Sequence, residues 1–273
     1  MNIITENLWS ETPGQCDEIP KITYYEAENK LTNATIIIFP GGGYRIRAEH
    51  EGKKYAEFFS KNGITSFVVD YRVAPHKFPL PLLDARRAVR FVRFYSEKYG
   101  IDKNRIAVMG SSAGGHLAAL TSTYFEEIPY ENIDIIDKEQ YLPNLQILAY
   151  PVINLYDKNI ANIGSGNNLI GSSYEETNDI YTRRSLTPSL IASPKTPDAF
   201  IWHTFDDKSV NVKNTFEYAS ALKDVGKTAE IHIFPNGKHG LGLADGDSDE
   251  QRHISQWSEL LLKWLKYIGW YNK

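Results

Sequence analysis

Residues 105–119 read RIAVMGSSAGGHLAA, and this stretch decides the fold. Residues 105–109 are short and apolar, as in a buried strand, whereas the small residues from Ala113 onward favour a helix. Between them GSSAG (110–114) fits the pattern G-x-S-x-G, with Ser112 at its centre. A sharp strand-to-helix turn needs small neighbours, because the serine backbone is strained and its hydroxyl must stand free. The stretch therefore predicts a nucleophilic serine, although a phosphate-binding loop or a plain tight turn would have a similar composition.

Short apolar runs alternate with helix-period segments on both sides of this stretch. Strands are predicted at residues 35–39, 64–70, 105–109, 145–150, 199–204 and 230–234, and helices at 52–61, 85–99, from 113, at 211–225 and at 254–268. This alternation is typical of a mostly parallel sheet with helices on both faces. Residues 154–196 interrupt the pattern with Asn, Ser, Gly and Tyr and predict a lid or insertion. The sequence thus predicts one α/β domain over residues 1–273.

Composition excludes several classes of protein. The 30 Lys and Arg against 34 Asp and Glu give a net charge of −4, which argues against binding to nucleic acid or to an anionic membrane. The single Cys16 can form neither an internal disulfide nor a zinc site, and no apolar run resembles a signal peptide. We therefore expect a cytoplasmic protein without metal or cofactor, and homo-oligomerisation stays open. Arg86, Arg87, Arg90 and Arg93 follow one helix, interpreted as a solvated face paired with acids.

A glycine run after the strand at 35–39 predicts an oxyanion hole. The tetrahedral intermediate of acyl transfer needs preorganised N–H donors in a dry site. One donor is expected from the residue after the nucleophile, Ala113, and the second from a glycine loop after an earlier strand, where Gly42 and Gly43 stand. Tyr44 follows this loop and could either bind substrate or merely pack.

The base and the acid are expected in loops that follow the last two strands. Seven histidines compete for the role of base: His50, His76, His116, His203, His232, His239 and His253. We favour His239, because it lies between glycines in a short loop after the strand at 230–234. Asp207 is the preferred acid and its neighbour Asp206 the alternative. The chain order Ser112, Asp207, His239 is that of an α/β-hydrolase triad.

With these residues in place, the chain resembles an α/β-hydrolase, and more narrowly the bacterial esterases that include acetyl-xylan-esterase-like and feruloyl-esterase-like enzymes. The resemblance is carried by FPGGGY (39–44), DYRVAP (70–75), DARRAVRFV (84–92), RIAVMGSSAGGHLAA (105–119), residues 185–207 and GKHGLGL (237–243). It implies Ser112 as nucleophile, Asp207 as acid and His239 as base. It also implies that Gly42, Gly43 and Ala113 donate their amides to the oxyanion.

The predicted function is a serine ester hydrolase that removes short acyl groups, acetyl first, from carbohydrate or another small alcohol through an acyl-enzyme. An amidase or peptidase using the same triad is one alternative, and a catalytically silent hydrolase-fold binding protein is the other. A glycosidase would need two opposed carboxylates, and nothing in the sequence marks such a pair.

Overall fold

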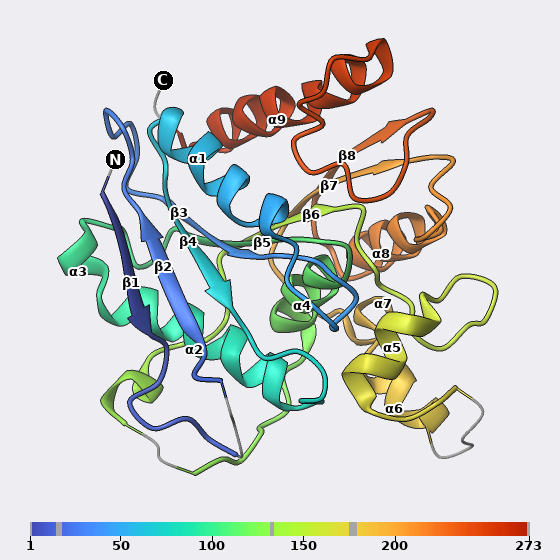
Figure 1. The fold of residues 1–273 in the computed structure, drawn as a ribbon, viewed down its shortest axis with the longest axis horizontal. Coiled ribbons are helices and arrows are strands. Elements are labelled where there is room, and N and C mark those ends of the chain that lie inside the picture. Colours follow the sequence, from blue (N-terminus) through green and yellow to red (C-terminus); the bar gives the residue numbers. More distant parts are fainter. Residues whose placement is uncertain (1, 15–17, 132–133, 175–178, 272–273) are drawn as a thin grey trace.

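The computed structural model describes residues 2–14, 18–131, 134–174 and 179–271, and Cys16 lies outside this part of the chain. Its centre is an eight-stranded sheet with strand order β1-β2-β4-β3-β5-β6-β7-β8 (Figure 1). The strands are β1 (Ile3–Asn7), β2 (Lys21–Tyr25), β3 (Thr35–Phe39), β4 (Thr65–Asp70), β5 (Ile106–Ser111), β6 (Leu145–Ala149), β7 (Ala199–Thr204) and β8 (Ala229–Phe234). From β4 to β8 neighbouring strands are parallel, whereas β1 and β2 join the edge antiparallel.

Side-chain alternation along the central strands builds two cores, one on each face of the sheet. In β3, Ile37 and Phe39 belong to one buried cluster, and Ile36 and Ile38 belong to the other. All five residues of β3 are buried, which explains why its sequence is continuously apolar rather than alternating. A sheet of this kind needs helices on both faces.

The helices divide between these two faces. They are α1 (Lys53–Lys61), α2 (Leu80–Phe94), α3 (Ser96–Tyr99), α4 (Ser112–Thr123), α5 (Ile163–Ile170), α6 (Asp179–Ser185), α7 (Pro188–Ile191), α8 (Lys213–Asp224) and α9 (Asp249–Tyr267), with short 3₁₀ turns η1 (Glu49–Glu51) and η2 (Ile135–Lys138). Helices α1 and α9 cover one face and α2, α4 and α8 the other (Figure 1). None of the helices in the described part of the chain has the length and apolarity to cross a membrane.

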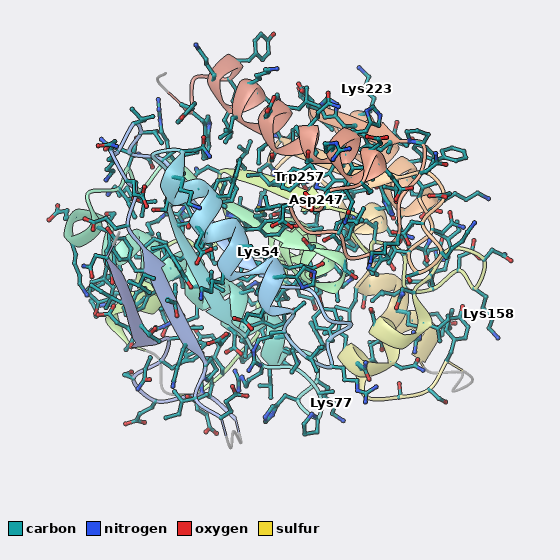
Figure 2. The ribbon with its side chains drawn as sticks, turned by 45° about the horizontal axis from the view of Figure 1, so that its top comes forward. Lys54, Lys77, Lys158, Lys223, Asp247 and Trp257 are labelled. Carbon is teal, nitrogen blue, oxygen red and sulfur yellow. The ribbon has the colours of Figure 1, made fainter. Side chains whose placement is uncertain are left out.

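Aromatic stacking fixes the C-terminal helix on the sheet. Trp257 of α9, labelled in Figure 2, is fully buried between the helix and the sheet. It stacks on Trp202 of β7 with 5.0 Å between ring centroids and 15° between planes. Leu261 and Trp264 continue the same helical face into the core. The predicted helical spacing of these apolar residues is therefore confirmed.

The predicted mostly parallel α/β fold is confirmed, and the main differences lie near its margins. The structure adds β1 and β2, which the sequence patterns did not predict. It also divides the helix predicted at 85–99 into α2 and α3, because Tyr95 departs from helical geometry (φ −90°, ψ 18°). Gly100, with φ +62°, ends α3 in the left-handed conformation that glycine adopts readily.

The interpretation of the arginines on α2 as a solvated face is wrong. Arg86, Arg87 and Arg93 are 4%, 1% and 7% exposed. Arg87 is paired with acids as expected, donating to both carboxylate oxygens of Asp134 at 2.7 Å, but it does so inside the protein. Arg93 donates to backbone carbonyls, including that of Lys103 at 3.0 Å. The guanidinium groups on α2 fasten residues 124–131 and 134–144 to the helix.

Candidate active site

Ser112 lies at a tight turn between β5 and α4. Its φ of +54° is a left-handed value that non-glycine residues rarely adopt. The flanking glycines explain how the chain turns so sharply. A Cβ on Gly110 would lie 2.0 Å from the carbonyl oxygen of Gly114, and a Cβ on Gly114 would lie 2.1 Å from that of Phe39. Any side chain at either position would therefore displace the backbone that presents Ser112.

The structure brings Ser112, His239 and Asp207 together, although they are 127 and 32 residues apart in sequence. Nε2 of His239 lies 2.8 Å from Oγ of Ser112, and Nδ1 lies 2.7 Å from Oδ2 of Asp207. The three residues follow β5, β8 and β7, whose carboxyl ends meet at one edge of the sheet. Parallel strands commonly place a site at that edge.

Asp207 is held as an anion by donors around both of its oxygens. Oδ1 accepts the amides of Ser209 and Val210 at 2.8 and 2.9 Å, and Nε2 of His203 lies 3.4 Å from Oδ2. Burial alone would raise the pKa of Asp207, but hydrogen bonds from His203 and His239 outweigh it and lower this pKa well below its ordinary value. The carboxylate beside the imidazole is therefore ionised at neutral pH.

Asp206, the alternative acid, does not reach the imidazole. Its Oδ1 accepts the amide of Gly237 at 2.8 Å. The hydroxyl of Thr204 donates to the carbonyl of the same glycine at 2.8 Å. Asp206 and Thr204 thus hold the start of the loop that carries His239.

The glycine loop after β3 lies at the same edge. Gly42 and Gly43 have φ values of +126° and +66°, and both line a cavity with Ser112 and His239. A Cβ on Gly42 would lie 2.3 Å from the carbonyl oxygen of Ile46, so this position requires glycine. Ala113 is fully buried in the first turn of α4, where backbone N–H groups have no partner within the helix. These placements agree with the expected oxyanion donors.

Tyr44 does not line the cavity, so the substrate-binding role expected for it finds no support. Its side chain is 0% exposed, and its hydroxyl lies 2.7 Å from Nδ1 of His116. Nε2 of His116 donates to the carbonyl of Leu186 at 2.8 Å, which leaves Nδ1 to accept from Tyr44. Tyr44 therefore packs behind the glycine loop and joins it, through His116, to the segment after α6.

The cavity has a volume of about 380 Å³; many of its lining residues have polar side chains, although most of the surface exposed in it is apolar. Its described lining residues are Gly42, Gly43, Arg45, Ala48, His50, Glu51, Ser112, Asn162, Gly164, Ser165, Asn168, Ser209, His239 and Gly240. Four of them come from the 154–196 segment, which places this segment beside the nucleophile. Asn162 caps α5 by accepting the Ser165 amide, and Asn168 donates to the carbonyl of Gly43.

Sequence reasoning missed these polar side chains, since neither Asn162 nor Asn168 belongs to a recognisable motif. It also missed Glu51, which lies in η1 below the glycine loop and is 3% exposed. Glu51 is the one carboxylate among the described residues that line the cavity. Charged residues in the middle of a chain are usually exposed, and no local pattern distinguishes one that is buried.

Comparison with known proteins agrees with this geometry. The BD-FAE family model matches residues 22–222. An acetyl ester-xyloside bifunctional hydrolase from Caldicellulosiruptor lactoaceticus is 40% identical, with a TM-score of 0.88 over 98% of this chain and 97% of that one. An acetylxylan esterase of Xylanibacter ruminicola is 33% identical over 85% of this chain, and endo-1,4-beta-xylanase B of Butyrivibrio fibrisolvens is 32% identical over 89%.

The chain spans 38% of the xylanase and 45% of the acetylxylan esterase, less than half of either curated relative. The family model covers most of the described sheet, from β2 into α8. The structural match extends over nearly the whole length of both chains. The resemblance inferred from the motifs is thereby confirmed, and this α/β-hydrolase chain belongs to the BD-FAE family.

Proposed function

We propose that this protein is a serine ester hydrolase that removes acetyl groups from carbohydrate. The observation that carries the proposal is the hydrogen-bonded series from Ser112 through His239 to Asp207, at the rim of a cavity that Gly42 and Gly43 also line. A nucleophile, a base and an orienting acid, with backbone amides nearby, form the arrangement that acyl transfer requires.

The hydrogen bonds of the triad support one direction for each proton transfer. Because Nδ1–H of His239 donates to the anionic Asp207, the Nε2 atom is free to accept the proton of Ser112. Oγ then attacks the ester carbonyl, and the oxyanion that forms is stabilised by the amides of Gly42, Gly43 and Ala113. The imidazolium returns its proton to the alcohol as the carbon–oxygen bond breaks. Water then repeats these steps on the acetyl-enzyme and releases acetate.

Polar side chains at the cavity support a hydroxyl-rich alcohol. Asn162, Ser165, Asn168 and Ser209 offer donors and acceptors, and Arg45 adds a cation at the same cavity. Binding of a long acyl chain would instead require an extended apolar wall. The names of the similar proteins, an acetylxylan esterase and an acetyl ester-xyloside hydrolase, point to the same class of substrate.

Cleavage of a glycosidic bond is not part of the proposal, although one similar protein is named as a xyloside hydrolase. Such cleavage usually needs two carboxylates on either side of the bond. Among the described residues Asp207 is bound by His239, and Glu51 is the one carboxylate lining the cavity. A 4-nitrophenyl β-xyloside therefore serves as a comparison substrate, on which we expect no turnover.

Hydrolysis of 4-nitrophenyl acetate by the wild type and by Ser112→Ala tests the proposal. The matched control is Ser122→Ala, a second buried serine on α4 whose hydroxyl donates to the Ala118 carbonyl in the same helix. We expect the first variant to lose activity by a factor on the order of 10⁴ or more, and the control to stay near wild type. Acetate release from acetylated xylooligosaccharides then tests the alcohol.

Three outcomes would contradict the proposal. Full activity in Ser112→Ala would exclude Ser112 as nucleophile. Faster cleavage of an anilide such as 4-nitroacetanilide than of the ester would favour an amidase. A wild type that neither hydrolyses esters nor reacts with a fluorophosphonate would favour a silent binding protein.

A further inference from the structure

Glu51 is a buried carboxylate that neither the triad nor the oxyanion amides account for. Its Oε2 accepts the amide of Gly41 at 2.9 Å, at the start of the glycine loop. A Cβ on Gly41 would lie 2.4 Å from this oxygen and 2.6 Å from the carbonyl oxygen of Ser111, so the loop is held close to both. On its other side, the carbonyl of Gly41 accepts the amide of Ala48 at 2.8 Å.

The second oxygen of Glu51 leads to the histidine loop. The hydroxyl of Tyr150 donates to Oε1 at 2.7 Å, and the same hydroxyl accepts the amide of Gly242 at 2.9 Å. The Tyr150 ring also lies edge-on to His239, with 5.0 Å between ring centroids. Glu51 and Tyr150 therefore form one bridge between the loop that carries the oxyanion glycines and the loop that carries the base.

The direction of every hydrogen bond in this bridge is fixed by chemistry. Both ends, Gly41 and Gly242, are amide donors, and burial raises the pKa of Tyr150 well above its ordinary value, so that its hydroxyl keeps its proton. The Glu51 carboxyl group therefore accepts one hydrogen bond at each oxygen, and the Tyr150 hydroxyl links one of these bonds to Gly242. Chains of this kind strengthen each member in a low-dielectric interior.

A second contact joins the same two loops nearer the surface. Nε2 of His50, the residue before Glu51, donates to the carbonyl of Gly240 at 2.9 Å. Gly240 follows the base directly, and both His50 and Gly240 line the cavity. Two successive residues of η1 are thus linked to the backbone on the C-terminal side of His239, His50 directly and Glu51 through Tyr150.

We propose that Glu51 and Tyr150 are positioning residues that fix the oxyanion loop and the histidine loop relative to each other. The role rests on the proposed function, because it matters only if both loops act on one ester carbonyl. Neither side chain forms a hydrogen bond with Ser112 or His239. Together they set the distance between the amides that bind the oxyanion and the imidazole that moves the proton.

Two nearly isosteric variants break the bridge at different points. Glu51→Gln offers one acceptor and one NH₂ group to two donors, so either Gly41 or Tyr150 loses its partner. Tyr150→Phe keeps the ring against His239 and removes the relay to Gly242. Tyr218→Phe is the matched control, since Tyr218 is also fully buried and donates one hydrogen bond, to Gln146 at 2.9 Å.

Amide hydrogen exchange tests the bridge independently of activity. For each variant, exchange is measured at the glycine amide that the substituted residue does not contact. We expect Glu51→Gln to accelerate exchange at Gly242, and Tyr150→Phe to accelerate it at Gly41. Tyr218→Phe should change neither amide. If each variant affects just the amide beside its own substitution, the two loops are not coupled and the proposal is overturned.

The kinetic arm uses 4-nitrophenyl acetate and the phosphonylation rate of Ser112 by a fluorophosphonate. A misplacement of about 1 Å can cost on the order of 100-fold in rate. We expect kcat and the phosphonylation rate to fall by about 10- to 100-fold in both bridge variants, whereas KM should stay within about threefold of the wild-type value. The double variant should be no less active than the less active single variant, because both substitutions break the same bridge. Full kcat with coupled exchange would overturn the positioning role. An unreactive wild type would refute the proposed function, whereas the exchange result would still decide the bridge.

Discussion

Asp206 and Asp207 are neighbours in the chain, but their carboxylates hold different parts of the same loop. Oδ2 of Asp207 lies 2.7 Å from Nδ1 of His239, whereas Oδ1 of Asp206 accepts the backbone amide of Gly237 at 2.8 Å. One acid therefore orients the imidazole, and the other anchors the backbone two residues before it. The sequence alone offered both as candidates for the same role.

Substitution of each acid by its amide should separate these two contributions. Asp207→Asn keeps the shape but favours the wrong imidazole tautomer, and we expect kcat on 4-nitrophenyl acetate to fall on the order of 10³- to 10⁴-fold. Asp206→Asn keeps an oxygen that can accept from Gly237, so its loss should stay below about tenfold. A larger loss in Asp206→Asn than in Asp207→Asn would reverse the assignment of the acid.

Local patterns were sufficient to predict the central strands and the site residues that follow them. The strands at 35–39, 105–109 and 199–204 are buried on both faces, so a continuous apolar run marks each one. Ser112 lies between small residues, because the backbone there must turn sharply, and His239 lies in a short loop with Gly237 and Gly240 close by. Each signal is contained within a few residues and needs no knowledge of distant contacts.

The features that the sequence did not predict depend on distant contacts. Strands β1 and β2 form the edge of the sheet and show mixed burial, so their composition lacks the apolar run of a central strand. The guanidinium of Arg87 is buried because distant residues supply its acceptors, among them both carboxylate oxygens of Asp134, 47 residues away. Tyr44 can be buried because His116, 72 residues away, accepts a hydrogen bond from its hydroxyl. A residue's partner far along the chain leaves no local pattern.

Two glycines of the oxyanion loop should differ in their tolerance of a side chain. At Gly43 an added Cβ meets just the hydroxyl of Ser165 at 3.8 Å, so Gly43→Ala suffers mainly from its φ of +66°, which costs about 1–2 kcal/mol. At Gly42 the added Cβ lies 2.3 Å from the Ile46 carbonyl oxygen, which must move. We expect Gly42→Ala to lose about 100-fold or more in kcat and Gly43→Ala less. Equal kcat values would contradict the placement of Gly42.

Arg45 should contribute to binding of the sugar rather than to chemistry. It is an exposed cation on the cavity lining, and among the described residues it forms no ion pair. We expect Arg45→Ala to raise KM for acetylated xylooligosaccharides severalfold while kcat/KM for the small 4-nitrophenyl acetate changes by less than about twofold. Lys53→Ala, which removes a positive charge from α1 outside this cavity, is the control. A matching loss in the control would indicate a general effect of charge.

His116 should make stability depend on pH between about 4 and 6.5. Its imidazole is fully buried between Tyr44 and the carbonyl of Leu186. Burial lowers its pKa from 6.5 to about 4, although the hydrogen bond to Leu186 acts in the opposite direction. The folded protein therefore keeps this histidine neutral at pH values where the unfolded chain already binds a proton.

The sign of the effect follows from where the proton binds. Below pH 6.5 the unfolded state takes up a proton that the folded state refuses until about pH 4, so the free energy of unfolding falls as pH decreases through this window. At about 1.4 kcal/mol per pH unit, the His116 contribution amounts to about 3 kcal/mol. Urea unfolding of the wild type and of His116→Gln at pH 7, 6, 5 and 4.5 should show a flatter dependence in the variant. Parallel curves would mean that His116 is protonated in the folded state, and the tautomer that binds Tyr44 and Leu186 would have to be reassigned.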